Sequence, residues 1–264
     1  MGKKGVLLVN LGTPDSPSTA DVRKYLAEFL MDGRVIDVPY PLRALLVRGI
    51  IVPFRGPKSA KTYRAIWSEN GSPLMHYSVR SAELLKERLG DDYHVELAMR
   101  YQSPSIQSAL NKLKAAKVDS IQVIPLFPQY ASATTGSIHD KVLEIVKSKL
   151  LTPRGLRSLS PDDPGYKGYY FGNQISRDHA YHNGTVWAWL LGHFAEGYLK
   201  LHGKAAKIFV EKIIKGFDGV MTQYGVGTVA EIYDGDAPHR PKGSVSQAWS
   251  IAELLRMMDL VKQV

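Results

Sequence analysis

Two stretches of the sequence contain the residue types that could bind or transform a ligand. Residues 125–137 (PLFPQYASATTGS) place hydroxyls and an aromatic ring after an apolar run, which suits a flat ligand with polar edges. Residues 177–189 (RDHAYHNGTVWAW) and 227–236 (GTVAEIYDGD) combine indole faces with carboxylates, an amide and histidines, which suits a sugar. Each stretch also has a purely structural interpretation: a turn with a helix cap, a helix core or a solvated acidic turn.

Smaller motifs narrow the chemistry. Residues 10–14 (NLGTP) include a glycine that lets a ligand approach the backbone, but neither GxGxxG nor a P-loop is present. Arg55 could hold the carboxylate of an anionic ligand, or belong to a solvated basic loop. His179 and His182 beside Asp178 lack a matched third ligand, so we expect no metal site and no resident cofactor. The chain has no cysteine, which excludes disulfides and thiolate chemistry.

Strands and helices alternate around the first stretch. The predicted strands are 6–10, 94–100 and 120–127, and the predicted helices are 18–31, 105–116 and 136–146. This alternation indicates βαβ units, and therefore a parallel sheet with helices on both faces. Ligands bind at the carboxyl ends of the strands in such sheets, which is where residues 125–137 lie.

The second half of the chain has a different pattern. We predict a loop over 151–172, helices over 185–201 and 204–217, a glycine-rich loop over 224–243 and a last helix over 246–261. Because no strand is predicted between these helices, this half is expected to be all-α. Loops as long as the glycine-rich one are often functional.

The charge of the chain is +9, and most of the excess lies in the first half. It could attract an anionic ligand or a membrane, but a solvated basic surface is the favoured explanation, and we expect no nucleic-acid partner. Residues 42–54 are apolar with interspersed arginines, which suits either peripheral contact with a membrane or a lip over an apolar pocket. No apolar run approaches the roughly 18–20 residues that span a bilayer, so a cytoplasmic protein is predicted.

The first half resembles the ferrochelatases, enzymes that insert iron into protoporphyrin. The matching segments are 7–14, 21–32, 53–58, 71–74, 98–101 and 128–137. The resemblance covers about residues 4–147, and it implies one of two similar doubly wound α/β halves that hold the porphyrin between them. It also implies that the porphyrin is bound by Asn10, Leu11, Gly12, Thr13, Arg55, Arg100, Tyr101, Tyr130 and Thr135.

The histidine motif of that family does not occur in this sequence. Ferrochelatases carry an essential histidine in a His-(Gly/Ser)-Leu-Pro motif, with an acidic partner later in the chain. No histidine here precedes Gly/Ser-Leu-Pro, and His76, His94 and His139 are expected to be ordinary surface or loop residues. The resemblance therefore implies porphyrin binding without completed iron insertion.

The second half resembles the carboxyl-terminal end of glycogen debranching enzyme, its amylo-α-1,6-glucosidase domain. The matching segments are 150–155, 159–164, 177–191, 231–241 and 246–250. The resemblance covers about residues 149–261 and implies part of an (α/α)6 barrel that hydrolyses α-1,6 branches with inversion. It gives Glu231 the role of general base, and places Asp178, His182 and Trp187 near the sugar pocket.

Inversion needs two carboxyl groups, about 6.5–9.5 Å apart, and the matching general acid lies in a part of that family not found here. We therefore expect two domains, 1–148 and 149–264, meeting at a seam near 146–150 without a linker. The leading hypothesis is a fusion that lacks the full activity of either enzyme. A porphyrin-binding protein of the haem pathway and an α-glucan-binding fragment are the alternatives. Exposed apolar faces of an incomplete barrel would favour self-association.

Overall fold

The computed structural model describes residues 3–264, which form two compact units. Unit 1 ends at Val142 and unit 2 begins at Leu143. The division falls inside helix α6 (Ser137–Lys149), close to the boundary predicted at 148.

A parallel three-stranded sheet forms the centre of unit 1, in the order β2-β1-β3. The strands are β1 (Lys4–Gly12), β2 (Tyr93–Tyr101) and β3 (Ser120–Pro125). Val6 faces Val95 on one side and Gln122 on the other. The three predicted strands and their parallel arrangement are therefore confirmed.

Alternation along β1 distributes its side chains to the two faces of the sheet. Val6 and Leu8 pack with helix α4 (Pro73–Leu89), through Leu85 among others. Leu7 points to the opposite face, where α5 (Ile106–Ala115) contacts β1 and β2, and it is fully buried. Burying each such side chain contributes roughly 2 kcal/mol to the stability of the fold. Helices thus cover both faces, as the alternation predicts.

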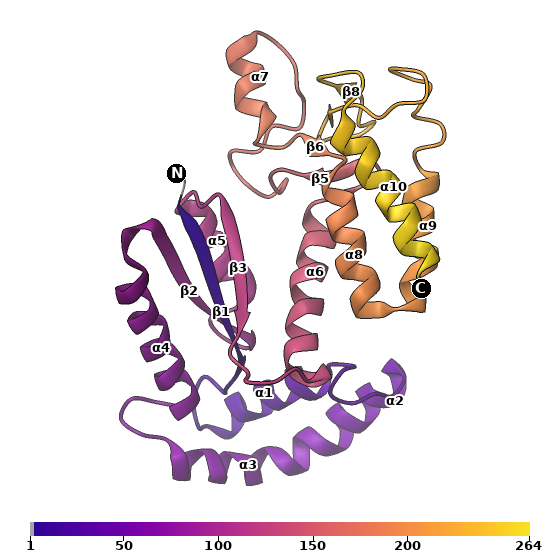
Figure 1. Cartoon of the computed structure of the whole chain (residues 1–264). Helices are drawn as coiled ribbons and strands as arrows, with labels where there is room; N and C mark the ends of the chain where they lie inside the picture. The colour runs from indigo at the N-terminus through magenta and orange to yellow at the C-terminus, as the bar shows by residue number, and fades with distance from the viewer. Residues whose placement is uncertain (1–2) are drawn as a thin grey trace. The chain divides into compact units, whose positions relative to one another are not determined.

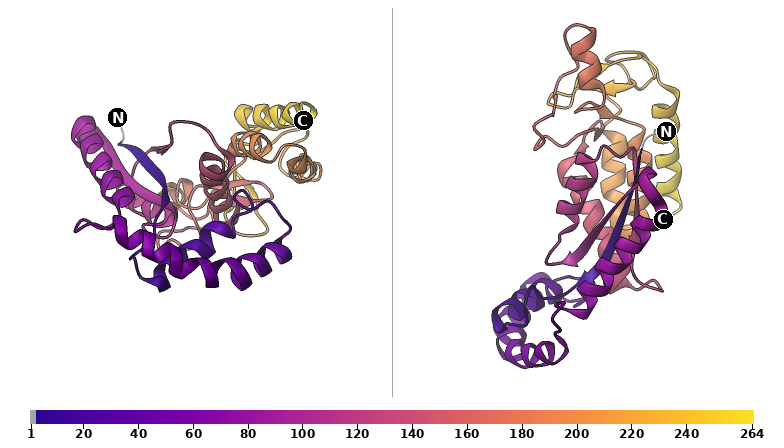
Figure 2. Two further views of the ribbon diagram at one scale, coloured as in Figure 1. Left: turned by 90° about the horizontal axis from the view of Figure 1, so that it is seen from below. Right: turned by 90° about the vertical axis from the view of Figure 1, so that its left-hand side faces the viewer.

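The amino ends of two helices follow from capping residues. Ser18 caps α1 (Thr19–Leu30) by accepting a hydrogen bond from the Asp21 amide, and Ser105 caps α5 in the same way. Helices α1 and α3 (Val52–Ile66) lie at the carboxyl ends of the strands (Figures 1 and 2). The remaining short elements of unit 1 are α2 (Tyr40–Ala44), the π-helix η1 (Leu45–Ile51), the 3₁₀ turn η2 (Gly90–Asp92) and the π-turn η3 (Ser132–Gly136).

The apolar segment 42–54 is helical. Val47 is fully buried against α1, whereas Leu45 and Phe54 are mostly exposed. Arg43 does not face solvent as a free cation, because it donates to the carbonyls of Ile36 and Val38 at 3.1 and 3.0 Å. The segment therefore has one packed face and one bare apolar face.

Unit 2 contains an antiparallel sheet, so the prediction that this half is all-α is wrong. Its strands are β4 (Leu151–Thr152), β5 (Gly155–Arg157), β6 (Val186–Trp187), β7 (Ile232–Tyr233) and β8 (Pro241–Lys242), in that order. Strands of two or three residues are too short to show alternation in a sequence. The ladder instead joins segments far apart in the chain, such as Val186 with Tyr233.

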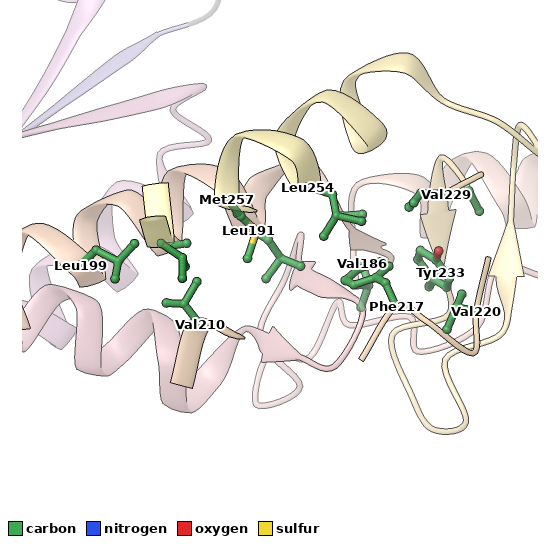
Figure 3. Close-up of a cluster of buried hydrophobic side chains, with 14 of the residues drawn as sticks. Val186, Leu191, Leu199, Val210, Phe217, Val220, Val229, Tyr233, Leu254 and Met257 are labelled. Atoms are coloured by element: carbon green, nitrogen blue, oxygen red, sulfur yellow. The ribbon is translucent and has the colours of Figure 1, made fainter. Parts of the chain in front are cut away.

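The helices of unit 2 are α7 (Gln174–Tyr181), α8 (Leu190–His202), α9 (Lys204–Lys215) and α10 (Ala248–Lys262). Helices α8, α9 and α10 share a core in which Leu191, Val210, Phe217 and Met257 are buried (Figure 3). The predicted helices over 204–217 and 246–261 are confirmed. The one predicted over 185–201 begins later, because its first residues pair in β6, and α7 was not predicted. Among residues 3–264, no helix is long and apolar enough to cross a bilayer.

Candidate functional site

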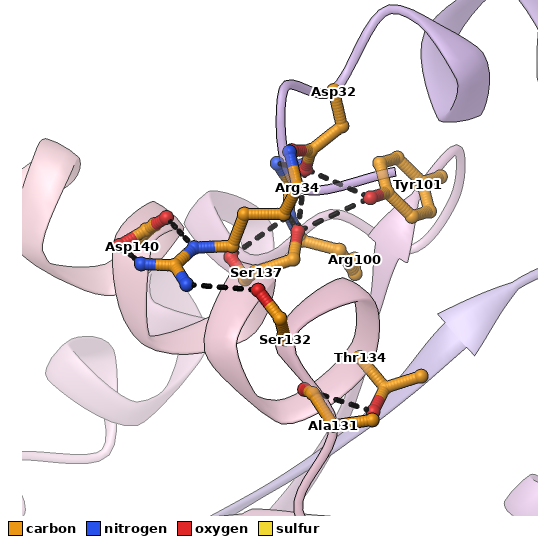
Figure 4. A network of polar contacts seen from close by, with 9 residues as sticks. All are labelled: Asp32, Arg34, Arg100, Tyr101, Ala131, Ser132, Thr134, Ser137 and Asp140. Atoms are coloured by element: carbon orange, nitrogen blue, oxygen red, sulfur yellow. Dashed lines mark hydrogen bonds and ion pairs between the residues drawn. The ribbon is translucent and has the colours of Figure 1, made fainter. Parts of the chain in front are cut away.

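Asp32, in the turn after α1, is the centre of a polar network at the carboxyl end of β2 (Figure 4). Its Oδ2 atom accepts hydrogen bonds from the Arg100 guanidinium at 2.7 Å, the Tyr101 phenol at 2.8 Å and the Ser137 hydroxyl at 2.6 Å. Its Oδ1 atom accepts from the Arg34 amide at 2.7 Å. The carboxylate therefore joins the end of β2 to the start of α6.

The donors around Asp32 keep it ionised. Burial opposes ionisation, but the hydrogen bonds from Ser137, the Arg34 amide and Tyr101, with the charge of Arg100, hold the pKa of Asp32 below its ordinary value. Burial raises the pKa of Tyr101, so its phenol stays protonated and donates. At neutral pH the site thus holds a carboxylate–guanidinium pair.

A second ion pair extends the network to η3. The Arg34 guanidinium pairs with Asp140 of α6 and donates to the Ser132 hydroxyl at 3.1 Å. Its Nη1 atom would also lie 3.1 Å from any Cβ added at Gly136, so a side chain at that position would crowd the guanidinium. Asp32 falls inside a segment that matched the ferrochelatases, but neither it nor Arg34 was predicted to have a role. An isolated Asp-Gly-Arg turn gives no sign of its distant partners.

The residues that end β1 are held by α4 and β2. Asn10 donates to the Ser78 hydroxyl at 2.9 Å, and Thr13 donates to the buried Ser72 hydroxyl at 2.9 Å. Gly12 has φ +118°, and a Cβ there would lie 2.1 Å from the Tyr101 carbonyl oxygen. Only glycine fits where β1 approaches the Tyr101 carbonyl of β2 this closely.

A hollow of about 520 Å³ opens between α4 and the carboxyl ends of β1 and β3. Tyr77, Leu126 and Phe127 supply apolar walls, and Asn10 and Ser78 supply polar atoms. Its size is within the range of about 300–1,000 Å³ that small ligands occupy. An apolar hollow with a few polar atoms can hold a large, flat ligand at the edge where the sequence predicts one.

A second hollow, of about 360 Å³, lies beside the Asp32 network. Arg48, Arg100 and Lys141 line it together with Asp32. Three cations against two carboxylates, the second being that of Glu28, make this surface suited to an anionic group.

The structure distributes the nine predicted porphyrin residues rather than gathering them in one hollow. Asn10 lines the larger hollow and Arg100 the smaller one. Tyr101 is only 1% exposed, so it holds the network and offers no surface to a ligand. Tyr130 is 65% exposed. Arg55 is also exposed, but it lies on helix α3 and not in the solvated basic loop that the sequence allowed. Leu11, Gly12, Thr13 and Thr135 lie at the same end of the sheet, in β1, the loop that follows it and η3.

Unit 2 gathers three of its four predicted sugar-site residues around Tyr181. The Tyr181 phenol donates to Glu231 Oε1, and the Ser244 amide donates to Glu231 Oε2 at 2.8 Å. The His182 ring stacks on Trp187 with centroids 5.6 Å apart, and the edge of Tyr181 meets Trp187 at 4.9 Å. Asp178 is exposed on α7.

This arrangement leaves the Glu231 carboxylate oriented. Burial and the hydrogen bond to Glu231 raise the pKa of Tyr181 to about 12, so the phenol remains a donor at neutral pH. Trp187 is buried and donates from its indole to Thr185 at 3.1 Å, so its ring is fixed. Tyr181 was not predicted as a site residue, although it lies inside the quoted 177–189 motif.

The fold and site of unit 1 define an α/β protein with a parallel sheet and a ligand hollow at the carboxyl ends of its strands. Comparison with known proteins gives the family. The ferrochelatase family model matches residues 3–168, so the chain belongs to the ferrochelatase family. The matched region continues past the seam predicted near 146–150.

Individual relatives agree with the family match. The chain is 48% identical to a ferrochelatase of Bdellovibrio bacteriovorus over 170 residues, which is 64% of this chain and 50% of the relative. It is 52% identical to a ferrochelatase of Coxiella burnetii over 140 residues, 53% of this chain and 40% of the relative. It is 47% identical to a ferrochelatase of Legionella pneumophila over 151 residues, 57% of this chain and 45% of the relative. The chain spans half or less of the length of these relatives.

Proposed function

We propose that unit 1 binds a porphyrin at the carboxyl ends of its sheet, as a ferrochelatase-family protein of haem biosynthesis. The observation that most strongly supports this proposal is the hollow of about 520 Å³ at the carboxyl ends of the strands. The family match covers the whole of this sheet. Tyr77, Leu126 and Phe127 would contact the macrocycle, and Asn10 and Ser78 its polar edge. The cationic lining of the smaller hollow would attract porphyrin carboxylates.

Iron insertion needs a base for the pyrrole protons in addition to a porphyrin site. The residues described above bind and orient, but none is positioned as a base for the pyrrole protons. We therefore propose porphyrin binding with iron insertion much weaker than that of a full-length relative. Iron would be a substrate of that reaction and not a resident metal.

A porphyrin titration tests the binding proposal. Protoporphyrin added to the full chain should shift its Soret band and saturate. Tyr77→Ala should weaken binding about tenfold, because an aromatic wall contributes on the order of 1–2 kcal/mol beyond a methyl group. Tyr169→Ala, which removes another exposed tyrosine, in unit 2, should leave the titration unchanged. The absence of any Soret change would sink the proposal.

We also propose that the α2–η1–α3 segment contacts a membrane surface. Leu42, Leu45, Ile50 and Phe54 are each more than half exposed, and Arg55 lies beside them. Apolar side chains with adjacent cations suit the boundary of an anionic bilayer. Flotation with anionic vesicles should retain the chain, and Phe54→Ser with Leu45→Ser should release it. Equal retention of the double variant would contradict the assignment.

A second candidate function concerns unit 2, as an α-glucan-binding segment similar to the end of a debranching enzyme. The observation that favours it is the convergence of Glu231, His182 and Trp187 around Tyr181. In this proposal Glu231 is the general base, and the chain is a fusion of two enzyme segments, the second related to part of an (α/α)6 barrel. Branched maltooligosaccharides should bind, and Glu231→Gln should keep binding but abolish any hydrolysis. No measurable binding would exclude it.

The exposed apolar side chains of unit 2 extend this second proposal to self-association. Ile208 and Leu255 are largely exposed on α9 and α10. Sedimentation velocity should show a dimer that Ile208→Ser and Leu255→Ser weaken. A monomer at all concentrations would contradict this part alone.

A further inference from the structure

A hollow of about 540 Å³ in unit 2 borders Glu231 but is lined by none of the residues assigned to the functions proposed above. It lies between the segment before α7 and strand β8, which sit at the same end of unit 2 (Figure 1). Its side-chain lining is aromatic and cationic: Tyr170, Phe171, Tyr224, Arg177 and Lys242. This combination sets it apart from the hollows of unit 1.

Two of the three aromatic rings are held in place by the protein. Tyr224 donates from its phenol to the Gly243 carbonyl at 3.1 Å. The Tyr170 amide donates to the buried Asp234 carboxylate at 2.9 Å, and the Tyr170 ring lies 6.0 Å from that of Tyr181. Phe171, by contrast, is 78% exposed. An aromatic wall with two fixed rings and one solvent-exposed ring can stack against a sugar at little cost in conformational entropy.

Arg177 and Lys242 differ from three arginines of unit 2 whose side chains are engaged within the fold. Arg154 donates to the Gly216 carbonyl, Arg157 donates to the Gly235 carbonyl, and Arg256 pairs with two glutamates. Within residues 3–264, the side chains of Arg177 and Lys242 have no hydrogen-bond or ion-pair partner. Two unpaired cations on one hollow attract an anionic group, and a guanidinium beside an ammonium suits a phosphate.

Two glycines form part of the same wall. Gly172 and Gly243 both line the hollow and have φ values of +98° and +69°, which favour glycine. A Cβ at Gly243 would lie 2.5 Å from Glu231 Oε2, so the hollow adjoins that carboxylate. Each glycine brings backbone to this wall, and a carbonyl that already accepts one hydrogen bond, as that of Gly243 does from Tyr224, has a second lone pair for a ligand hydroxyl.

We propose that this hollow binds a phosphorylated monosaccharide. The sugar ring stacks on the aromatic wall, its hydroxyls meet the backbone at Gly172 and Gly243, and its phosphate is held by Arg177 and Lys242. The site requires neither porphyrin binding by unit 1 nor hydrolysis of a glucan by Glu231. Its test therefore succeeds or fails independently of both functions proposed above.

Calorimetric titration of the full chain with glucose 6-phosphate tests the proposal. Saturable binding is expected, and glucose and inorganic phosphate should each bind at least about tenfold more weakly, because each lacks one half of the recognition. Arg177→Gln and Lys242→Gln should each lower the affinity for glucose 6-phosphate about tenfold. Lys212→Gln, which removes an exposed charge on α9, is the matched control and should bind like the parent chain.

The remaining outcomes distinguish the parts of the site. Phe171→Ala should weaken glucose 6-phosphate severalfold and leave inorganic phosphate unaffected, because the ring contacts only the sugar. Equal affinities for glucose 6-phosphate and inorganic phosphate would overturn the saccharide assignment. Equal affinities for glucose 6-phosphate and glucose, or no effect of both charge-removing variants, would overturn the phosphate assignment. Unchanged thermal unfolding of each variant shows that the fold is intact.

Discussion

Asp32 in unit 1 and Glu231 in unit 2 are two carboxylates that the protein holds in different ways. Asp32 receives three side-chain donors and one amide, and one of the donors is the guanidinium of Arg100. Glu231 receives a phenol and an amide, and forms no ion pair within the described chain. The charge of Asp32 is therefore neutralised inside the fold, whereas that of Glu231 is oriented but remains available to a ligand.

The difference shows how a structural carboxylate can be told from a candidate catalytic one. A neutralised carboxylate whose partners come from β2, α6 and the turn after α1 holds elements together. A carboxylate held only by neutral donors, beside aromatic rings, has no cation partner inside the fold and is left to interact with a ligand. This distinction predicts opposite consequences when each carboxylate is disturbed.

The largest effect is expected from Asp32→Ala. The substitution leaves the Arg100 side chain, 14% exposed, without its carboxylate, and breaking a largely buried pair costs about 3–5 kcal/mol. Urea unfolding followed by hydrogen exchange at the β1 and β2 amides should show this loss in unit 1. Asp15→Ala is the control, because Asp15 pairs with the exposed Lys24 and should cost less than about 1 kcal/mol. Equal losses in both variants would remove the structural role of Asp32.

A smaller effect is expected from acid. Because the folded-state pKa of Asp32 is lowered, its ionisation stabilises the fold above the unfolded value of about 3.9. That stability is lost as pH falls through the lower folded-state pKa. The unfolding free energy of the parent chain should therefore decline below about pH 4 more steeply than that of Asp32→Asn, measured by urea titration at each pH. Parallel pH profiles would show that Asp32 has no such linkage.

The smallest effect on stability is expected from Tyr181→Phe. It removes one neutral donor from Glu231, and the loss of such a hydrogen bond costs about 1 kcal/mol. Tryptophan fluorescence during thermal unfolding reports mainly on unit 2, where Trp187, Trp189 and Trp249 lie, because only Trp67 lies in unit 1. Tyr169→Phe, at an exposed ring, should have no effect. A loss as large as that of Asp32→Ala would make Glu231 a structural residue too.

The accuracy of sequence-based prediction differs between the two units for a physical reason. Strands β1 and β2 are nine residues long, and their apolar runs were enough to predict them. The five strands of unit 2 have two or three residues each, so their ladder depends on partners far away in the chain. The helices of unit 2 were predictable from apolar spacing, except for the short α7, whose residues are mostly exposed.

The candidate sites also depend on partners that are far apart in the chain, so the sequence predicted them only in part. The motifs placed Asn10, Arg100, Glu231 and Trp187 in functional segments. The structure added Asp32 and Tyr181, whose partners are 68 and 50 residues away in the chain. A hydrogen bond between such distant residues leaves no local pattern in a sequence.

The sequence by itself determined the ferrochelatase-like parallel sheet of unit 1, because its strands are long enough, and its helices are capped clearly enough, to show in the local pattern of residues. It also determined which segments carry polar and aromatic groups at the strand ends. Only the tertiary structure decided that Tyr101 is buried, that Asp32 is neutralised by Arg100, and that Arg177 and Lys242 share a hollow. These features depend on distances between elements, which the packing of side chains sets and the order of residues does not display.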